Sequence, residues 1–350
     1  MSTITRRGFV KSMGAAPLVI GAAIDARSVA AAAAAPGPWS YVDPELAAAL
    51  KKFPPVEDPS ARNLAALRAG DTASSVSKAP QLQPRKATVP GPAGQKDVPV
   101  LIIDPKPNQK NRPATVYIHG GGFVVGRADT NLQLAQDIAE ATQSLVVSVD
   151  YTLAPEAVFP IAREQNYAAL AWVHENAGRL GIDRERIAVM GDSAGGGHAA
   201  MLAIAARDRG KYKIAYQCLI YPMLDDRTGS TNRVPPYIGH FNWTEAANRF
   251  GWTSLLGVAA GSASVPQGAV PARVTNLAGL PPTFIGVGSI DLFFAEDVEY
   301  AKRLALSGVS TELHVMPGAY HGFDVVTRTA KLTVHFRNAW QTALRRGLGL

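Results

Sequence analysis

The chain has 350 residues, of which 47% are hydrophobic and 18% charged, and its net charge is +7. These values are typical of a globular protein with a large core, and the length suits one large α/β domain with insertions or two small domains. Lysine and arginine form no run with interleaved aromatic residues, so we expect no nucleic-acid partner. The single cysteine, Cys218, excludes an intramolecular disulfide, a cysteine-based zinc site and a thiol redox pair.

The first 35 residues have the pattern of an export signal. The pair Arg6-Arg7 resembles the twin-arginine motif, an uncharged stretch follows over 12–24, and the small residues from Val29 to Ala35 offer cleavage points. The apolar stretch is shorter than the about 20 residues that a membrane-spanning helix needs. We therefore expect a twin-arginine-type signal peptide, an exported protein that is periplasmic or secreted, and no membrane span in the mature chain.

Residues 36–84 are rich in proline and contain two short helical patterns, over Asp43–Lys52 and near 60–69. Neither pattern is long enough for a domain, so we expect an N-terminal cap arm that packs on the main body. Residues 86–104 alternate as strands do, and the turn-forming Pro90-Gly91-Pro92 interrupts them. This pattern predicts an antiparallel edge hairpin at the start of a catalytic domain that covers 85–350.

From residue 114 onward, expected strands and helices alternate. The expected strands are Thr115–Ile118, Leu145–Val149, Arg186–Met190, Tyr216–Tyr221, Thr283–Val287 and Thr311–Val315. The expected helices are Asn131–Thr142, Arg163–Asn176, the segment around Ala199–Ala206, Glu296–Ser307 and Ala330–Arg346. Continuous apolar strands separated by helices predict an α/β fold with a mostly parallel sheet covered on both faces. The alternation stops over about 225–280, which we interpret as a cap insertion forming part of a lid or pocket wall.

One strand-to-helix turn has the pattern of a nucleophile. Gly191-Asp192-Ser193-Ala194-Gly195 reads G-x-S-x-G between an apolar strand and a helix. Small residues on both sides of Ser193 allow the sharp turn that exposes a serine hydroxyl. A bare G-x-S-x-G is usually an ordinary glycine turn, so the assignment depends on the partners of the serine.

Two later loops supply those partners in the order that the fold demands. Asp291 follows the strand Thr283–Val287, and His321 lies in the loop after Thr311–Val315. The carboxyl ends of parallel strands meet at one edge, so the acid and the base fall where Ser193 does. The sequence leaves other candidates open for both roles. For the acid they are Asp192, Asp225, Asp226, Glu296 and Asp297, and for the base they are His174, His198, His240, His314 and His335.

A glycine loop supplies candidate groups for binding the oxyanion. His119-Gly120-Gly121-Gly122-Phe123 follows the strand Thr115–Ile118 and leaves backbone N–H groups unshielded. The amides of Gly121, Gly122 and Ala194 are therefore candidate oxyanion donors. The loop lacks the Lys-Ser/Thr ending of a phosphate-binding P-loop and the glycine spacing of a dinucleotide site.

Together these motifs resemble the bacterial hormone-sensitive-lipase-like (family IV) carboxylesterases of the α/β-hydrolase superfamily. The likeness spans about 85–348 and rests on motifs in the right order: His119–Phe123 for H-G-G-G-[FW], Asp150–Glu156 for D-Y-R-L-A-P-E, Gly191–Gly196 for G-D-S-A-G-G and His321–Phe323 for H-G-F. Thr152 stands where the family has arginine, so an ion pair or packing contact is expected to be lost. The turn after Asp291 also departs from the family's D-P-L-R-D-E.

The resemblance implies an α/β-hydrolase fold with an eight-stranded sheet and a helical cap. It also implies a triad of Ser193, Asp291 and His321, with Gly121, Gly122 and Ala194 as oxyanion donors. We expect a serine carboxylesterase that hydrolyses short-to-medium acyl esters and needs no cofactor or metal. An amidase or peptidase on the same scaffold is the alternative, and a non-catalytic small-molecule receptor is a more distant one. A homodimer is one candidate assembly.

Overall fold

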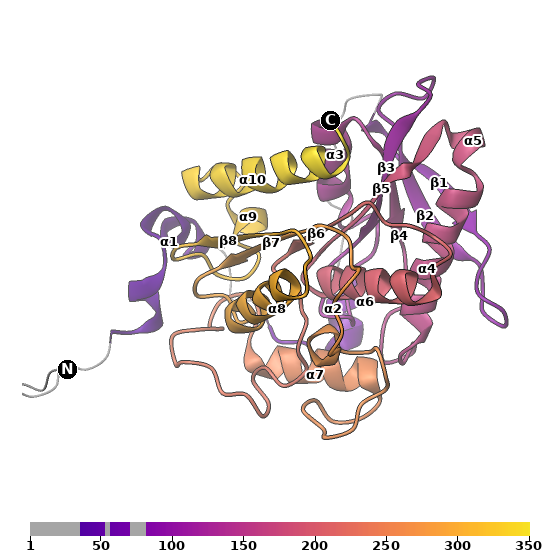
Figure 1. The fold of residues 1–350 in the computed structure, drawn as a ribbon. Helices are drawn as coiled ribbons and strands as arrows, with labels where there is room; N and C mark the ends of the chain where they lie inside the picture. Colours follow the sequence, from indigo (N-terminus) through magenta and orange to yellow (C-terminus); the bar gives the residue numbers. More distant parts are fainter. Residues whose placement is uncertain (1–35, 53–56, 71–81) are drawn as a thin grey trace, which may run out of the picture. The chain divides into compact units, whose positions relative to one another are not determined.

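The computed structural model describes residues 36–52, 57–70 and 82–350 (Figure 1). The expected signal peptide over 1–35 lies outside the described residues. Residues 37–350 form one compact unit. Among the helices of the described residues, none has the length and apolar character to cross a membrane.

The core of the fold is an eight-stranded sheet with the order β1-β2-β4-β3-β5-β6-β7-β8. Its strands are β1 (Arg85–Val89), β2 (Val98–Ile103), β3 (Arg112–Ile118), β4 (Leu145–Val149), β5 (Ile182–Asp192), β6 (Tyr216–Ile220), β7 (Thr283–Gly288) and β8 (Thr311–Met316). Strands β3 to β8 pair in parallel, whereas β1 and β2 form an antiparallel hairpin whose second strand joins β4 antiparallel. The mostly parallel sheet and the edge hairpin are therefore confirmed.

Helices cover both faces of this sheet (Figure 1). The helices of the main body are α3 (Leu132–Thr142), α4 (Ile161–Glu175), α5 (Ala177–Leu180), α6 (Ala194–Arg209), α8 (Phe294–Leu306), α9 (Phe323–Val326) and α10 (Lys331–Gly347). Successive strand residues bury toward opposite faces: Val147 packs in the cluster with residues of α4, α6 and α8, and Val146 in the cluster with residues of α3 and α10. A strand that is buried on both faces explains the continuous apolar runs in the sequence.

The N-terminal arm and the insertion contribute short elements: η1 (Pro38–Tyr41), α1 (Pro44–Leu50), α2 (Leu64–Gly70), α7 (Glu245–Leu256) and η3 (Pro271–Arg273). Helix α1 begins as expected, because the Asp43 carboxylate accepts the first backbone N–H groups of the helix. Helix α7 was not expected in the sequence. Its N-cap is Thr244, whose hydroxyl accepts from the amides of Ala246 and Ala247. The exact limits of the cap arm and the cap insertion stay a prediction.

The fold brings the singled-out motifs to one edge. Ser193 follows β5, Asp291 follows β7, His321 follows β8 and the glycine loop follows β3. All four strands are parallel, so their carboxyl ends lie along the same edge of the sheet.

Candidate active site

Ser193 occupies a strained turn between β5 and α6. Its φ of 54° and ψ of −124° lie in a region that side-chain-bearing residues rarely adopt. Two glycines make the turn sterically feasible: a Cβ on Gly191 would lie 2.2 Å from the carbonyl oxygen of Gly195, and a Cβ on Gly195 would lie 2.0 Å from that of Ile118. Hydrogen bonds from the Ser193 amide to Ile220 O and from the Met223 amide to Ser193 O hold the turn.

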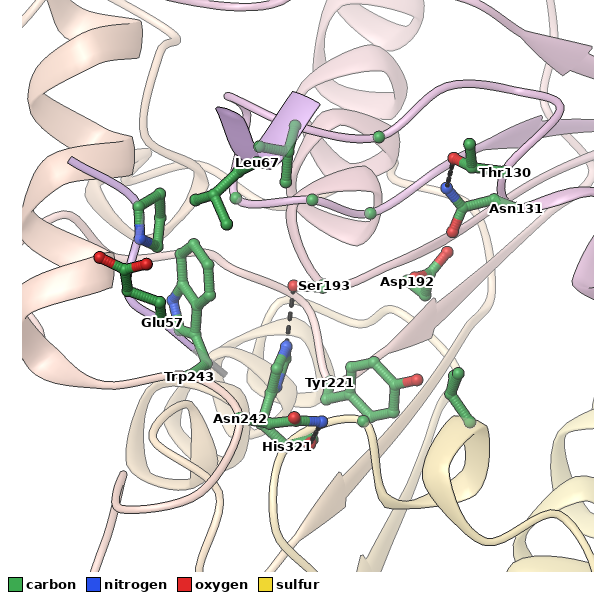
Figure 2. A pocket seen from close by; sticks show the side chains of 18 of the residues that line it. Glu57, Leu67, Thr130, Asn131, Asp192, Ser193, Tyr221, Asn242, Trp243 and His321 are labelled. Atoms are coloured by element: carbon green, nitrogen blue, oxygen red, sulfur yellow. Dashed lines mark hydrogen bonds between the residues drawn. The ribbon is translucent and has the colours of Figure 1, made fainter. Parts of the chain in front are cut away.

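Three side chains form a continuous hydrogen-bonded line at this turn. His321 Nε2 lies 2.9 Å from Ser193 Oγ (Figure 2). His321 Nδ1 lies 2.9 Å from Asp291 Oδ2. Asp291 is fully buried, and its other carboxylate oxygen, Oδ1, accepts from the Phe293 amide at 2.9 Å. The carboxylate therefore favours the tautomer with hydrogen on Nδ1, which leaves Nε2 as an acceptor for the serine hydroxyl.

Other residues fix the imidazole, and sequence reasoning did not assign them this position. The rings of Tyr221 and Phe293 stand edge-on to His321, with centroids 4.8 and 4.9 Å away. The Asn242 side chain donates to the His321 carbonyl oxygen at 3.0 Å. Tyr221 and Phe293 follow β6 and β7, and Asn242 belongs to the insertion, so only the folded chain brings them together.

None of the rival acids bonds to His321. Asp226 forms an ion pair with Arg273, and Asp225 forms one with Arg227. Glu296 accepts from the backbone amides of Leu224 and Asp225. Asp192 and Asp297 are buried, but neither bonds to the imidazole of His321, which leaves Asp291 as its partner.

The rival histidines are likewise away from Ser193. His314 bonds to Glu312 on its own strand, and His174 Nε2 bonds to the Lys213 carbonyl oxygen. His198 is buried in helix α6. His240 is exposed in the insertion, and His335 is exposed on helix α10. Only His321 meets the serine hydroxyl among the described histidines.

The glycine loop presents two backbone amides beside Ser193. In the described part of the chain, the amides of Gly121 and Gly122 donate to no backbone or side-chain acceptor. Both glycines have positive φ values, of 120° and 58°, and a Cβ on Gly122 would lie 2.0 Å from the Trp243 ring. Ala194 is the first residue of α6, so its N–H has no acceptor within the helix. The three expected donors thus lie on the two loops that flank the serine.

Two buried carboxyl groups, those of Asp192 and Asp324, lie next to the triad. Tyr117 donates to Asp192 Oδ1 at 2.7 Å, and Tyr221 donates to Asp324 Oδ1 at 2.8 Å. Burial raises the pKa of Asp192 to about 6, although the hydrogen bond from Tyr117 acts in the opposite direction. Burial also raises the pKa of Asp324, again against the hydrogen bond from its tyrosine. Neither carboxyl group forms a hydrogen bond with Ser193 Oγ, whose partner is His321.

Ser193 opens into a pocket of about 570 Å³, a size typical of small-molecule sites. The glycine loop lines this pocket together with Leu67 of α2 and Trp243 of the insertion (Figure 2). Among the described residues no group of three or more His, Cys, Asp or Glu side chains is arranged to hold a metal ion.

The comparisons with known proteins identify the family of this chain. The model of the family described as having the alpha/beta hydrolase fold matches residues 115–325. The chain is 37% identical over 248 residues to carboxylesterase NlhH of Mycobacterium tuberculosis, covering 70% of this chain and 76% of the relative. It is 36% identical over 270 residues to esterase LipI of the same organism, covering 76% and 82%.

Among solved structures, a bacterial heroin esterase superposes with a TM-score of 0.81 at 36% sequence identity. The superposition covers 89% of this chain and 99% of that structure. The chain belongs to the hormone-sensitive-lipase-like carboxylesterases of the α/β-hydrolase superfamily.

One departure from the family pattern has a structural counterpart. Thr152 replaces the arginine of the D-Y-R motif, and it pairs with Gln165 on α4 through two hydrogen bonds. The Thr152 amide donates to Gln165 Oε1 at 2.8 Å, and Gln165 Nε2 donates to Thr152 Oγ1 at 3.0 Å. A neutral polar pair therefore ties this loop to α4.

Proposed function

We propose that Ser193, His321 and Asp291 are the catalytic triad with which this carboxylesterase cleaves its substrates. The observation that carries the proposal is the unbroken line from Asp291 through His321 to Ser193, with both links at 2.9 Å, in the wall of a pocket. His321 Nε2 takes the hydroxyl proton as Ser193 Oγ attacks the ester carbonyl carbon. Asp291 holds the imidazole in position and stabilises the cation that forms.

The developing oxyanion is bound by the backbone amides of Gly121, Gly122 and Ala194. These donors are fixed by the strained loop and by the first turn of α6 before the substrate arrives, so they need no reorganisation during the reaction. The alcohol then leaves with the proton from His321. Water then attacks the acyl carbon while His321 takes its proton. The bond between this carbon and Ser193 Oγ breaks, His321 returns the proton to Ser193 Oγ, and the carboxylic acid is released.

We further propose that the substrates are esters of short-to-medium acyl chains. The pocket volume of about 570 Å³ supports this range, as does the enclosure of the serine by Leu67 and Trp243 (Figure 2). A series of nitrophenyl esters from acetate to dodecanoate measures the preference. A maximum of kcat/KM at the long end of that series contradicts the proposal.

The nucleophile is tested with nitrophenyl acetate on the wild type, on Ser193→Ala and on Ser264→Ala. Ser264 is an exposed serine of the insertion and provides the matched control. We expect kcat to fall by about 10⁴- to 10⁶-fold in Ser193→Ala, as for other serine triads, and to stay unchanged in Ser264→Ala. Undiminished turnover by Ser193→Ala overturns the assignment.

We also propose that the N-terminal segment directs export through Arg6 and Arg7. The motif, the uncharged stretch behind it and the following small residues support this proposal. Replacing both arginines with lysine keeps the charge and is expected to retain the protein in the cytoplasm, whereas Lys11→Arg leaves export unchanged. Cell fractionation followed by an ester assay measures the distribution. Equal export of the lysine pair contradicts the proposal.

A further inference from the structure

The charged side chains that line the substrate pocket are acidic. Glu57 and Asp192 line it together with the triad histidine, and no lysine or arginine is among the lining residues that the structure describes. In Figure 2, Asp192 lies on one side of the line between Ser193 and His321, and Glu57 lies on the other. A group bound next to Ser193 therefore has a carboxylate on either side.

The two carboxylates differ in burial. Asp192 immediately precedes the nucleophile and is only 8% exposed. Tyr117 holds its Oδ1, and its Oδ2 stands against the backbone of Gly120, where a Cβ would approach it to 2.5 Å. Glu57 is exposed at the pocket entrance. Water and salt screen an exposed charge far more than a buried one, so Asp192 contributes the larger part of the field inside the pocket.

Among the described residues that line the pocket, no lysine or arginine compensates for this charge. Behind Tyr221, the buried Asp324 adds a second carboxyl group to the same side of the pocket. Arg328 and Arg337 are both paired with Asp137, and the charge of Arg337 also acts on Asp324 and lowers its pKa against the effect of burial. The aromatic surfaces of Tyr221 and Trp243 also line the pocket, and their faces attract cations.

We propose that this pocket selects esters that carry a positive charge, such as esters of amino alcohols, and that Asp192 is the main specificity-determining residue. The inference rests on the proposed function, because the charge must lie on a substrate whose carbonyl reaches Ser193. The same field disfavours anionic esters and repels the carboxylate product, which promotes its release. The role of Asp192 differs from that of Asp291, because Asp291 bonds to the His321 imidazole and Asp192 does not.

The test compares two esters of the same shape. Acetylcholine carries a quaternary ammonium group, and 3,3-dimethylbutyl acetate has a neutral carbon in the place of the nitrogen. A pH-stat at pH 8, well above the pKa of about 6 of Asp192, measures kcat/KM for both. The ratio of the two values cancels any loss of active enzyme, so that a partly unfolded variant still gives a valid readout.

Three variants remove one negative charge each. Asp192→Asn keeps an acceptor for Tyr117 and is expected to lower the cation-to-neutral ratio by about fivefold, the effect of removing one partly screened charge. Glu57→Gln is expected to lower the ratio by about twofold, because its carboxylate is exposed. The control Glu140→Gln, an exposed residue of α3 outside the pocket, leaves the ratio unchanged.

The outcomes separate the two proposals. Turnover of the neutral ester that depends on Ser193, with a ratio unchanged in Asp192→Asn, overturns this inference and leaves the proposed function standing. Failure of the wild type to hydrolyse either ester, or turnover that survives Ser193→Ala, counts against the proposed function. If Asp192→Asn does not fold, the wild-type ratio decides: it falls between about 20 and 500 mM salt if attraction operates, and a constant ratio contradicts the inference.

Discussion

Gly122 has a conformation and a contact that only a residue without a side chain tolerates. Its φ is 58°, and a Cβ would lie 2.0 Å from the Trp243 ring. Added volume therefore moves either the ring or the amide that we assign to the oxyanion. The loop is restricted by its neighbours as well, because a Cβ on Gly121 would lie 2.0 Å from the Val125 carbonyl oxygen.

We expect Gly122→Ala to lower kcat by about 10²- to 10³-fold, the usual effect of losing one oxyanion donor. The matched control is Gly94→Ala, which has the same backbone strain at a φ of 80° but open space around its Cβ. Steady-state assays of both variants separate the loss of the donor from the cost of the backbone conformation. Equal activity of Gly122→Ala and Gly94→Ala contradicts the assignment.

His198 couples stability to pH through its burial in α6. It lies between the rings of Phe123 and Tyr151, and neither ring nitrogen has a hydrogen-bond partner in the described part of the chain. Desolvation lowers the pKa of His198 from 6.5 to about 3, helped by the neighbouring His119. The unfolded chain binds the proton more readily, so the stability associated with neutral His198 is present above pH 6.5 and is lost as the pH falls toward 3.

Replacing His198 with leucine removes this titration and keeps the side-chain volume similar. Between pH 7 and pH 5 the wild type is expected to lose about 2 kcal/mol more unfolding free energy than His198→Leu, as linkage requires for this pKa shift. Urea unfolding at the two pH values measures the difference. The buried carboxyl groups have raised pKa values, so their protonation stabilises the folded chain as the pH falls. This contribution is the same in the wild type and in His198→Leu, so it cancels in the comparison. Parallel stability curves contradict the prediction.

At the scale of elements, helix α2 is attached to the site by one arginine. Arg68 Nε donates to the Val124 carbonyl oxygen at 2.8 Å, and its Nη2 donates to that of Ala154 at 2.7 Å. Leu67, the preceding residue, lines the pocket over Ser193. Arg68 thus connects the N-terminal arm to the loop that follows the glycine motif.

We expect Arg68→Ala to raise KM about three- to tenfold with a smaller change in kcat, because charged hydrogen bonds contribute about 1.5–3 kcal/mol and part of that holds the pocket wall. Glu156→Gln serves as the control. The Glu156 side chain is 59% exposed, and surface ion pairs contribute about 0–1 kcal/mol, so its KM stays near that of the wild type. Full kinetics with nitrophenyl butyrate distinguish the two. An unchanged KM in Arg68→Ala shows that α2 does not shape the pocket.

At the scale of the whole molecule, residues 37–350 are compact by themselves. A chain that begins at residue 36 is therefore expected to keep kcat/KM within about twofold of the full chain, because the triad and the described pocket lie beyond this point. Ester assays and thermal unfolding of both chains provide the measurement. A large loss of activity in the shortened chain contradicts this expectation.

The pattern of apolar residues along the sequence predicts the positions of many strands and helices. The strand Leu145–Val149 and the first residue of β7 have the expected positions, because buried parallel strands read as apolar runs. The first residue of β8 also has the expected position, although this edge strand is only partly buried. The start of β5 was missed by four residues. The polar segment from Asp183 to Arg186 hides a strand that begins at Ile182, where it pairs with Arg112. Helix α7 was also missed, because Gly251 and Trp252 interrupt an otherwise helical pattern.

The amino-acid sequence by itself determined the class of this protein and the order of its reacting groups, since the motifs that carry Ser193, Asp291 and His321 are local signals tied to strand ends. Only the tertiary structure decided which groups surround them. Tyr221, Phe293 and Asn242 come from segments far apart in the chain and meet at His321. The acidic character of the pocket likewise arises from residues of different elements. Such proximity depends on packing in three dimensions, which no local pattern encodes.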